Sequence, residues 1–464
     1  MRYQSTRGQA PELGFDDVLL TGLARDGGLY MPIAWPQISP DDWRSFKGLD
    51  YAALAAAVTA PYVQGSVVES DYAQVMHNAY APFRHPAVAP MTQLTKNTWL
   101  MELFHGPTLS FKDYALQAVG HLFESVLKAR GEHLTIVGAT SGDTGSAAIA
   151  ACAGRDAIDI IILHPKDRVS EVQRRQMTTV EAENVHNVAV EGSFDDCQAL
   201  VKAMFNNQPF RDDLNLSAVN SINWARIMAQ TVYYVAASLA LGGPDRPVAF
   251  AVPTGNFGNA FAGACAAQMG LPIQRLLIGS NQNDILTRYF ETGVMTVEPV
   301  VSTISPAMDI QVSSNFERLL FEAYSRDGAA VKRLMDGLEQ NGSYTVSPEA
   351  RDRIAPQFVG SRLDDEGTKA IIQKTYDDTG RLVDPHTAIG IHAARVSEID
   401  QSIPRVVLAT AHPAKFPTAI EAASGIRPKL PDFMSGLFDR KERMTHLPND
   451  LLRVQDFVRA NTRI

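Results

Sequence analysis

The chain has 464 residues, more than one hydrophobic core usually supports, so we expect two or three domains. Its composition, 45% hydrophobic and 20% charged, is that of an ordinary globular protein, and its net charge of −9 argues against a general nucleic-acid-binding or anionic-membrane surface. Three widely separated cysteines, no membrane-spanning apolar run and no apolar stretch behind the N-terminus predict a cytoplasmic protein without a disulfide framework.

Residues 1–95 are expected to form a helical, loop-rich N-terminal domain that ends in a proline-containing linker. Beyond it, strands alternate with helices. We expect strands at 134–137, 158–163, 185–190, 248–252, 275–279 and 405–409, and helices at 146–153, from 194 and at 260–269. This alternation predicts the α/β class, with open, mainly parallel sheets covered by helices. We expect a smaller region at 96–230 and a larger one at 231–464, with ligands bound beyond the carboxyl ends of the strands.

A loop with two glycines follows the strand at 248–252 and opens a helix. Its residues are Thr254, Gly255, Asn256, Phe257, Gly258 and Asn259. Glycines let the backbone approach a ligand closely, and the free N–H groups of a helix N-terminus bind phosphate. The loop has neither the Lys-Ser/Thr of a Walker A motif nor the three-glycine spacing of a dinucleotide site. Taken alone, it is either a phosphate site or a tight strand-to-helix turn.

A second loop between a strand and a helix, at 140–145, gathers polar groups. It contains Ser141, Asp143 and Thr144. Their hydroxyls and carboxylate, with the neighbouring amides, can hold a carboxylate or an aromatic oxygen. Alternatively, one of these side chains only caps the helix.

A lysine, Lys112, is expected in the first turn of a helix, because Ser110 and Asp113 resemble a capping box. The helix macrodipole disfavours a cation at this position. Lys112 is therefore either an exposed lysine without a role or an amine whose pKa is lowered so that it can act as a neutral amine or an imine.

Together, these segments resemble the fold-type II pyridoxal-phosphate enzymes, and within them the threonine synthase family. The resemblance runs nearly end to end and rests on the stretches 3–7 (YQSTR), 23–32 (LARDGGLYMP), 105–113 (HGPTLSFKD), 138–145 (GATSGDTG), 217–226 (SAVNSINWAR), 253–259 (PTGNFGN) and 410–416 (TAHPAKF). It implies pyridoxal 5'-phosphate as cofactor and the conversion of O-phospho-L-homoserine and water to L-threonine and phosphate. This is a carbon–oxygen lyase reaction, the last step of threonine biosynthesis.

The resemblance also implies roles for individual residues. Lys112 holds the cofactor as a Schiff base and moves protons during the reaction, and the loop at 255–259 takes the cofactor phosphate. Thr410 faces the pyridine nitrogen. The substrate carboxylate and the cofactor ring are contacted by Ser141, Asp143 and Thr144. The 96–230 region then carries Lys112 and the carboxylate loop, and the 231–464 region carries the phosphate loop.

A substrate with its own phosphate needs a second anion site. Arg226 is the preferred candidate, because Ser221 and Asn223 place further polar donors just before its helix. Arg168 is another candidate, whereas Lys166 and Lys415 are more typical of ordinary surface or core residues. His105, His164, His386 and His412 favour core, capping or domain-contact roles, and no metal is expected. Partners are limited to the small-molecule substrate, with no nucleic acid or membrane, in a monomer or homodimer.

Three rival functions share parts of this pattern. Another fold-type II activity, such as a serine or threonine dehydratase or an O-phosphohomoserine phospholyase, would use the same lysine and phosphate loop. The second anion site and the N-terminal domain favour threonine synthase over these. A nucleotide-binding oxidoreductase or kinase lacks its glycine-rich fingerprints here. A non-catalytic relative is disfavoured because Lys112 and the phosphate loop are both intact.

Overall fold

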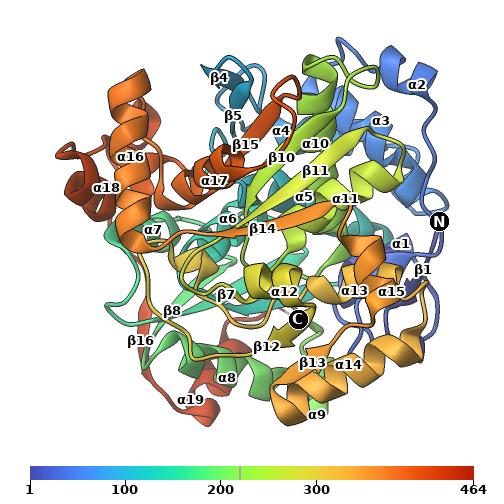
Figure 1. Ribbon diagram of the computed structural model, residues 1–464. Helices are drawn as coiled ribbons and strands as arrows, with labels where there is room; N and C mark the ends of the chain where they lie inside the picture. Colours follow the sequence, from blue (N-terminus) through green and yellow to red (C-terminus); the bar gives the residue numbers. More distant parts are fainter. Residues whose placement is uncertain (219–220, 464) are drawn as a thin grey trace.

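Two open sheets, built mainly of parallel strands, organise the chain (Figure 1). The computed structural model describes residues 1–218 and 221–463. The larger sheet has the order β14-β11-β10-β15-β5-β4, and all its neighbours are parallel except the β4–β5 hairpin. The smaller sheet has the order β16-β8-β7-β6-β9 and is parallel throughout. The α/β class and the mainly parallel sheets are as the sequence predicts.

All six strands expected from the sequence are present. The larger sheet contains β4 (Met91–Thr95), β5 (Thr98–Glu102), β10 (Val248–Pro253), β11 (Ile273–Ser280), β14 (Phe358–Arg362) and β15 (Arg405–Ala409). The smaller sheet contains β6 (Leu134–Ala139), β7 (Ile158–Pro165), β8 (Val185–Glu191), β9 (Leu216–Ser217) and β16 (Thr445–Pro448). Every residue of β7 and β10 is buried, which explains why these strands appear as unbroken apolar runs rather than alternating patterns.

Helices cover both sheets. In the α/β part they are α5 (Lys112–Arg130), α6 (Asp143–Cys152), α7 (Glu171–Thr178), α8 (Phe194–Asn206), α9 (Gln208–Asp213), α10 (Trp224–Ala240), α11 (Gly258–Gln268), α12 (Ile285–Thr292), α13 (Phe316–Ala323), α14 (Gly328–Asn341), α15 (Pro348–Ile354), α16 (Asp365–Thr379), α17 (Pro385–Val396), α18 (Pro417–Ser424) and α19 (Leu451–Ala460). A short hairpin, β12 (Val294–Thr296) with β13 (Ser343–Thr345), and the 3₁₀ turns η1 (Pro306–Met308), η2 (Pro413–Lys415) and η3 (Asp432–Met434) complete it.

Alternate residues of the strands serve two different cores. Ala251 and Val407 share a core with α17 on one face of the larger sheet, whereas Phe250 and Val406 belong to the main core with α10 and α11. Successive side chains of a strand point to opposite faces, so each strand is fixed from both sides. This rigid support holds the loops at the carboxyl ends in place.

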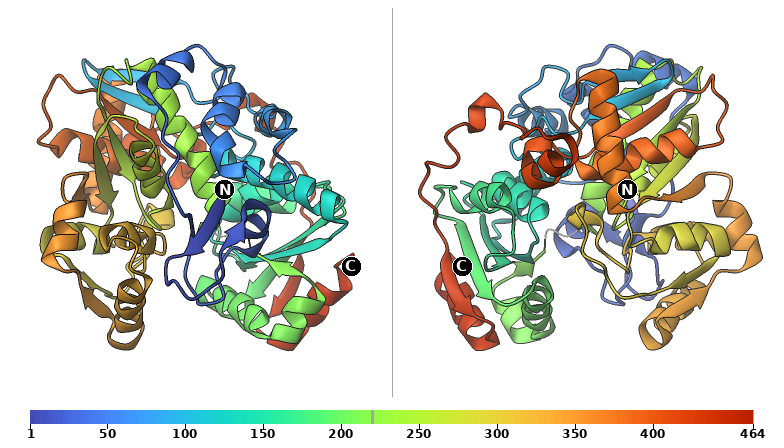
Figure 2. Two further views of the ribbon diagram at one scale, coloured as in Figure 1. Left: turned by 90° about the vertical axis from the view of Figure 1, so that its right-hand side faces the viewer. Right: turned by 60° about the vertical axis from the view of Figure 1, so that its left-hand side comes forward.

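Sheet membership does not follow chain order at two places. Strand β5, within the expected smaller region, pairs with β15 of the larger sheet. Strand β16, within the expected larger region, returns to pair with β8 of the smaller sheet, and Figure 2 shows this C-terminal segment in red beside the green helices. The boundaries at 95 and 230 stay predictions, but each of the two sheets contains a strand from the region expected to form the other sheet.

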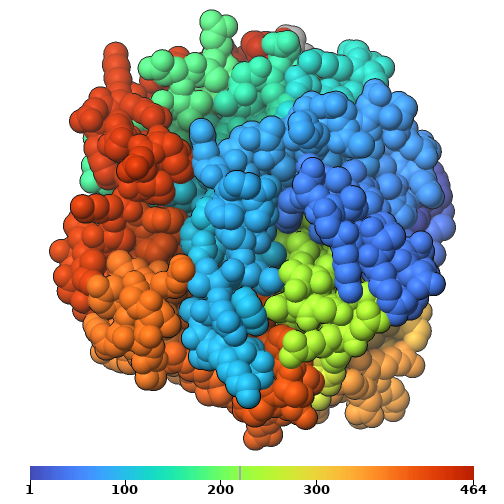
Figure 3. Space-filling view, turned by 90° about the horizontal axis from the view of Figure 1, so that it is seen from above, coloured from blue at the N-terminus to red at the C-terminus, as the bar shows by residue number. Residues whose placement is uncertain are grey.

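The N-terminal region is helical and loop-rich, as expected, and packs on the α/β part. Its elements are α1 (Phe15–Thr21), α2 (Pro40–Ser45), α3 (Tyr51–Val63), α4 (Tyr72–Tyr80) and an antiparallel sheet β2 (Leu13–Gly14), β1 (Arg2–Ser5) and β3 (Tyr30–Pro32). The sequence patterns did not indicate this sheet. Helices α3 and α4 pack on α10 and α5, and Figure 3 shows the blue N-terminal residues beside the yellow-green segment that contains α10. The region therefore supports two helices that carry site residues.

Candidate active site

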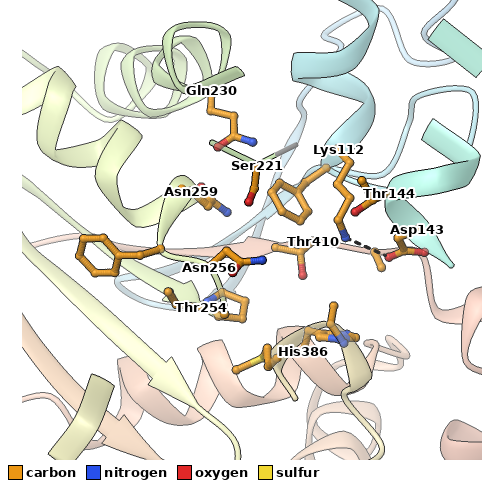
Figure 4. Close-up of a pocket in the computed structure, with 18 of the residues that line it drawn as sticks. Lys112, Asp143, Thr144, Ser221, Gln230, Thr254, Asn256, Asn259, His386 and Thr410 are labelled. Carbon is orange, nitrogen blue, oxygen red and sulfur yellow. Dashed lines mark hydrogen bonds and ion pairs between the residues drawn. The ribbon is translucent and has the colours of Figure 1, made fainter. Parts of the chain in front are cut away.

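One cavity lies where loops beyond the carboxyl ends of β6, β10 and β15 converge (Figure 4). Its volume is about 730 Å³ with open solvent included, which suits a cofactor or small ligand. It is lined by most of the residues singled out from the sequence: Lys112, Asp143, Thr144, Ser221, Arg226, Gly255, Asn256, Phe257, Gly258, Asn259 and Thr410. Ser141 and Asn223 are not among the lining residues.

The loop at 254–259 presents backbone amides to this cavity. Among the described residues, none accepts a hydrogen bond from the N–H groups of residues 255–257, and the first N–H groups of α11 have no acceptor within the helix. Phe257 adopts a left-handed conformation with φ of 61°. A Cβ at position 255 would lie 2.7 Å from the carbonyl oxygen of Ala307, so glycine is required there. The loop is a cradle of free donors at a helix N-terminus, which suits a phosphate.

The amine of Lys112 lies in a buried network of charges. Its Nζ is 3.6 Å from Oδ2 of Asp143, and the other oxygen of Asp143 is 2.8 Å from Nζ of Lys415. Burial lowers the pKa of Lys112, partly opposed by the nearby carboxylate. Burial by itself would raise the pKa of Asp143, but Lys415 and Lys112 together hold it well below its usual value. The sequence offered Lys415 only as a less favoured candidate for the second anion site and did not indicate its contact with Asp143.

The helix that carries Lys112 begins as expected, but not with the expected cap. Lys112 is the first residue of α5, and no side chain caps it at the preceding residue. The capping box expected from the sequence is only half formed: the Ser110 N–H donates to Oδ2 of Asp113 at 3.4 Å, but the Asp113 N–H donates to the carbonyl oxygen of Ser110, whose hydroxyl accepts from the Lys112 amide at 3.4 Å instead. The Asp113 carboxylate also accepts from the amide and hydroxyl of Thr108, at 2.9 and 2.6 Å. Asp113 thus stabilises the loop before the lysine.

In the loop at 140–145, helix capping and contact with the cavity belong to different residues. Capping belongs to Thr140, whose hydroxyl oxygen accepts from the amides of Gly142 and Gly145 at 3.0 and 2.9 Å. Asp143 and Thr144 line the cavity, while Ser141 is exposed. This arrangement leaves Asp143 and Thr144 as the groups of the loop that face a ligand.

The stretch at 217–226 contributes one cation to the cavity wall. Val219 and Asn220 of this stretch lie outside the described residues. Arg226 and Ser221 line the cavity, and burial lowers the pKa of Arg226 to about 10. The Asn223 side chain accepts from the Ala225 amide as the N-cap of α10 and donates to the carbonyl oxygen of Leu19. Asn223 therefore holds the helix and the N-terminal region rather than facing the cavity.

The other basic candidates are placed elsewhere. Lys166 lies 3.7 Å from the carboxylate of Glu191 and does not line the cavity, and Arg168 is exposed. Lys415 is fully buried and also donates to the carbonyl oxygen of Thr108 at 2.7 Å. Arg226 is thus the arginine, of those proposed from the sequence, that reaches the cavity.

Comparison with known proteins identifies the family. Residues 83–410 match the family model described as pyridoxal-phosphate dependent enzyme, and residues 2–80 and 387–458 match those described as threonine synthase N terminus and threonine synthase, C-terminal. The chain belongs to the threonine synthase family. A threonine synthase of Pseudomonas aeruginosa is 52% identical over 459 residues, which cover 99% of this chain and 98% of that protein.

Solved structures of threonine synthases agree with this assignment. The crystal structure of PLP-bound threonine synthase from Brucella melitensis has a TM-score of 0.98 at 53% identity and covers all of both chains. Threonine synthase from yeast has a TM-score of 0.93 at 37% identity, covering 99% of this chain and 98% of that one. The family, the fold-type II architecture and the pyridoxal-phosphate cofactor expected from the sequence are confirmed.

The residues of this threonine synthase family member fit the cofactor. A buried amine, Lys112, faces a separate cradle of amide donors in the same cavity. Next to the cradle, Asn259 is 7% exposed, and its Nδ2 has no hydrogen-bond partner among the described residues. Its Oδ1 accepts from Tyr233 at 2.6 Å and Tyr234 at 2.9 Å, which fixes the amide so that Nδ2 is available. These donors are what a phosphate ester bound beside a reactive amine requires.

Several lining residues were not expected at the site from the sequence, among them the buried His386. Nδ1 of His386 lies 2.7 Å from Oδ2 of Asp384, and its Nε2 accepts from the Ala307 amide at 3.3 Å. Figure 4 places it across Thr410 from Lys112. The other lining residues not named from the sequence as site residues are Phe111, Gln230, Pro253, Ala307, Met308 and Ala411, whereas Thr254 belongs to the glycine loop singled out there. His386 was expected in a core, capping or domain-contact role, and nothing in the sequence indicated that it lines the cavity.

His412, two residues beyond Thr410, predicts a measurable pH effect. Burial and the neighbouring His105 lower its pKa from 6.5 to about 4, and its Nδ1 accepts from the Ala414 amide at 3.1 Å. The unfolded chain therefore binds a proton between pH 6.5 and pH 4 that the folded chain does not. The free energy of unfolding should fall by about 3 kcal/mol from this group as the pH drops through that window.

The variant His412→Asn should flatten the dependence of unfolding free energy on pH in that window, because asparagine still accepts from the Ala414 amide but does not titrate. Urea unfolding at a series of pH values measures it. His446→Asn, at an exposed histidine of β16, is the control and should leave the dependence as in wild type. An unchanged slope in His412→Asn would contradict the assignment.

In the described ranges 1–218 and 221–463, no group of three or more His, Cys, Asp or Glu side chains is arranged to hold a metal ion. Within the same described ranges, no helix has both the length and the apolar character needed to cross a membrane.

Proposed function

We propose that the chain converts O-phospho-L-homoserine and water to L-threonine and phosphate in the last step of threonine biosynthesis. The observation that carries the proposal is the cavity itself, which combines the buried amine of Lys112, the amide cradle at 255–259 and the cation Arg226. The phosphate-bearing substrate and the phosphate-bearing cofactor both need such donors. The full-length similarity to threonine synthases supports the same reaction.

The chain's own residues have defined tasks in this proposal. Bound pyridoxal phosphate supplies the electron sink that stabilises negative charge at the substrate carbons. Nζ of Lys112, with its lowered pKa, takes and returns protons at those carbons, and Asp143 holds the lysine near the reaction centre. The cradle at 255–259 anchors the cofactor phosphate, and Thr410 faces the pyridine nitrogen. Thr144 and Asp143 border the place for the substrate carboxylate and the cofactor ring.

The second anion site is proposed at Arg226 and Ser221. The carbonyl oxygen of Ser221 lies 3.5 Å from where a Cβ of Gly258 would be, so this wall adjoins the amide cradle. The cradle and Arg226 then form one continuous electropositive surface that can neutralise the phosphate of the substrate beside that of the cofactor. Asn223 supports this wall by capping α10, whereas the exposed Ser141 does not line the cavity.

The test is a coupled assay of the purified chain with pyridoxal phosphate and O-phospho-L-homoserine. Threonine and phosphate released in equal amounts support the proposal. Phosphate released with 2-oxobutanoate would assign the chain as a phospholyase, and no turnover with cofactor bound would overturn both. Arg226→Gln should raise KM by roughly 10- to 100-fold, as expected for a lost hydrogen bond to a charged group. Arg168→Gln, at an exposed arginine, is the control.

We further propose a cytoplasmic location and a monomer or homodimer. The location is supported by three free, buried cysteines that form no disulfide. Sedimentation of the purified protein distinguishes the two assembly states.

A further inference from the structure

A buried arginine lies behind the phosphate cradle. Arg318, in α13, has 0% of its surface exposed, and no carboxylate of the described residues forms a salt bridge with it within 4.0 Å. Its guanidinium donates instead to neutral oxygens: to the carbonyl of Ile222 at 2.6 Å, to the carbonyl of Tyr30 at 3.1 and 3.3 Å, and to Oδ1 of Asn315. The neighbouring Glu317 carboxylate is engaged with Arg7 at 3.1 Å. A buried cation held only by neutral acceptors is costly unless another charge offsets it.

Asn315 connects this arginine to the cradle. Its Nδ2 donates to the carbonyl oxygen of Asn256 at 3.0 Å and to that of Ser221 at 3.1 Å, and its backbone N–H also donates to Asn256 at 3.1 Å. The hydroxyl of Ser313 donates to the carbonyl oxygen of Gly255 at 2.8 Å. The carbonyl oxygens of Gly255 and Asn256 are therefore both bound from the outer side of the cradle.

This anchoring fixes the direction of the amides on the inner side. In a trans peptide the C=O of one residue and the N–H of the next point in opposite directions. Holding the oxygens of Gly255 and Asn256 outward therefore points the N–H groups of Asn256 and Phe257 toward the cavity. Those are the N–H groups without an acceptor among the described residues.

We propose that Asn315 and Arg318 are positioning residues for the cofactor phosphate. Asn315 orients the amide donors of the cradle, and Arg318 fixes Asn315 and supplies a positive charge that a phosphate dianion in the cradle offsets. The same guanidinium also donates to the carbonyl oxygen of Tyr30 in β3. Phosphate binding in the cradle should therefore also affect the N-terminal region. The proposal rests on the cofactor site of the proposed function, but not on the identity of the substrate.

The experiment compares two aldehydes that differ only in the phosphate. Apo-protein is titrated with pyridoxal 5'-phosphate and with pyridoxal, and both dissociation constants are measured by absorbance. Because both ligands react with the same lysine, their ratio isolates the phosphate contribution. Asn315→Ala should weaken pyridoxal phosphate by roughly 10- to 100-fold, the loss expected for hydrogen bonds to a charged group, and should leave pyridoxal nearly unchanged.

The matched control is Asn184→Ala. Asn184 is also buried and also joins backbone carbonyls, those of Cys152 at 2.7 Å and Ile158 at 2.8 Å, but it lies in the smaller sheet region away from the cavity. It should lower stability without changing the ratio. If Asn315→Ala and Asn184→Ala change the ratio equally, or if neither changes it, the proposal is overturned.

The arginine has its own test. Arg318→Lys keeps the charge and loses the forked geometry, whereas Arg318→Met loses both, so the lysine variant should recover part of the pyridoxal-phosphate affinity that the methionine variant loses. Hydrogen exchange on adding inorganic phosphate should show protection of the Tyr30 and Met31 amides in wild type and not in Asn315→Ala. Equal protection in both would overturn the link to the N-terminal region. These measurements use no substrate, so their outcome does not depend on whether the chain forms threonine.

Discussion

Replacing Lys112 with alanine is expected to abolish covalent attachment of the cofactor and to lower turnover by at least about 10²- to 10⁴-fold, the usual contribution of a positioned proton-transfer group. The reason is geometric, because Lys112 provides the amine that lines the cavity opposite the amide cradle. Visible absorbance of the variant with added pyridoxal phosphate, and the release of threonine and phosphate, measure the two losses.

The control for this variant is Lys166→Ala. Lys166 pairs with Glu191 outside the cavity, so both the absorbance and the turnover should stay at wild-type values. The amide cradle is intact in Lys112→Ala, so the variant should still bind pyridoxal phosphate noncovalently. Wild-type turnover in Lys112→Ala would show that another group transfers the protons.

The parts of the site that the sequence predicted are those coded by neighbouring residues. The loop at 254–259 follows a buried strand and opens a helix, and its glycines mark the close backbone approach that Gly255 makes to Ala307. Lys112 was placed correctly in the first turn of a helix although the capping box is only half formed, because both arrangements start the helix within two residues. A helix start indicated by neighbouring residues can therefore be predicted correctly even when one expected hydrogen bond is absent.

The parts that were not predicted depend on contacts between distant segments. Lys415 belongs to a stretch that was recognised, but only the folded chain brings it to Asp143. His386 reaches the cavity because α17 packs across the larger sheet. Likewise, β16 carries no pattern that selects the smaller sheet over the larger one. Burial and partner choice at these residues are tertiary properties, which residue spacing along the chain does not encode.

Replacing Lys415 with methionine is expected to lower the free energy of unfolding by about 3 kcal/mol at neutral pH, because it removes the nearer cation of a buried ion pair and leaves Asp143 only the more distant Lys112, at 3.6 Å. The lysine is fully buried, and its Nζ contacts both Asp143 and the carbonyl oxygen of Thr108. Urea unfolding of the apo-protein measures the loss. Lys128→Met is the control, since that exposed lysine pairs with Glu124 on the surface and such pairs contribute about 1 kcal/mol or less.

The loss should depend on pH in a defined direction. In wild type the pKa of Asp143 is depressed, so its stabilising contribution is present above the unfolded pKa of about 4 and disappears as the pH falls through the lower folded value. Without Lys415, only Lys112 and the hydrogen bond from Gln173 oppose the effect of burial, so the pKa of Asp143 rises from its wild-type value and the carboxylate is protonated more readily. The difference between wild type and Lys415→Met should therefore be largest near neutral pH and shrink below about pH 4. Adding Asp143→Asn should recover part of the loss at neutral pH, because it removes a buried carboxylate that Lys112 alone compensates only in part. A pH-independent difference, or no recovery in the double variant, would mean that Lys415 stabilises the fold by packing alone and does not hold the carboxylate beside Lys112.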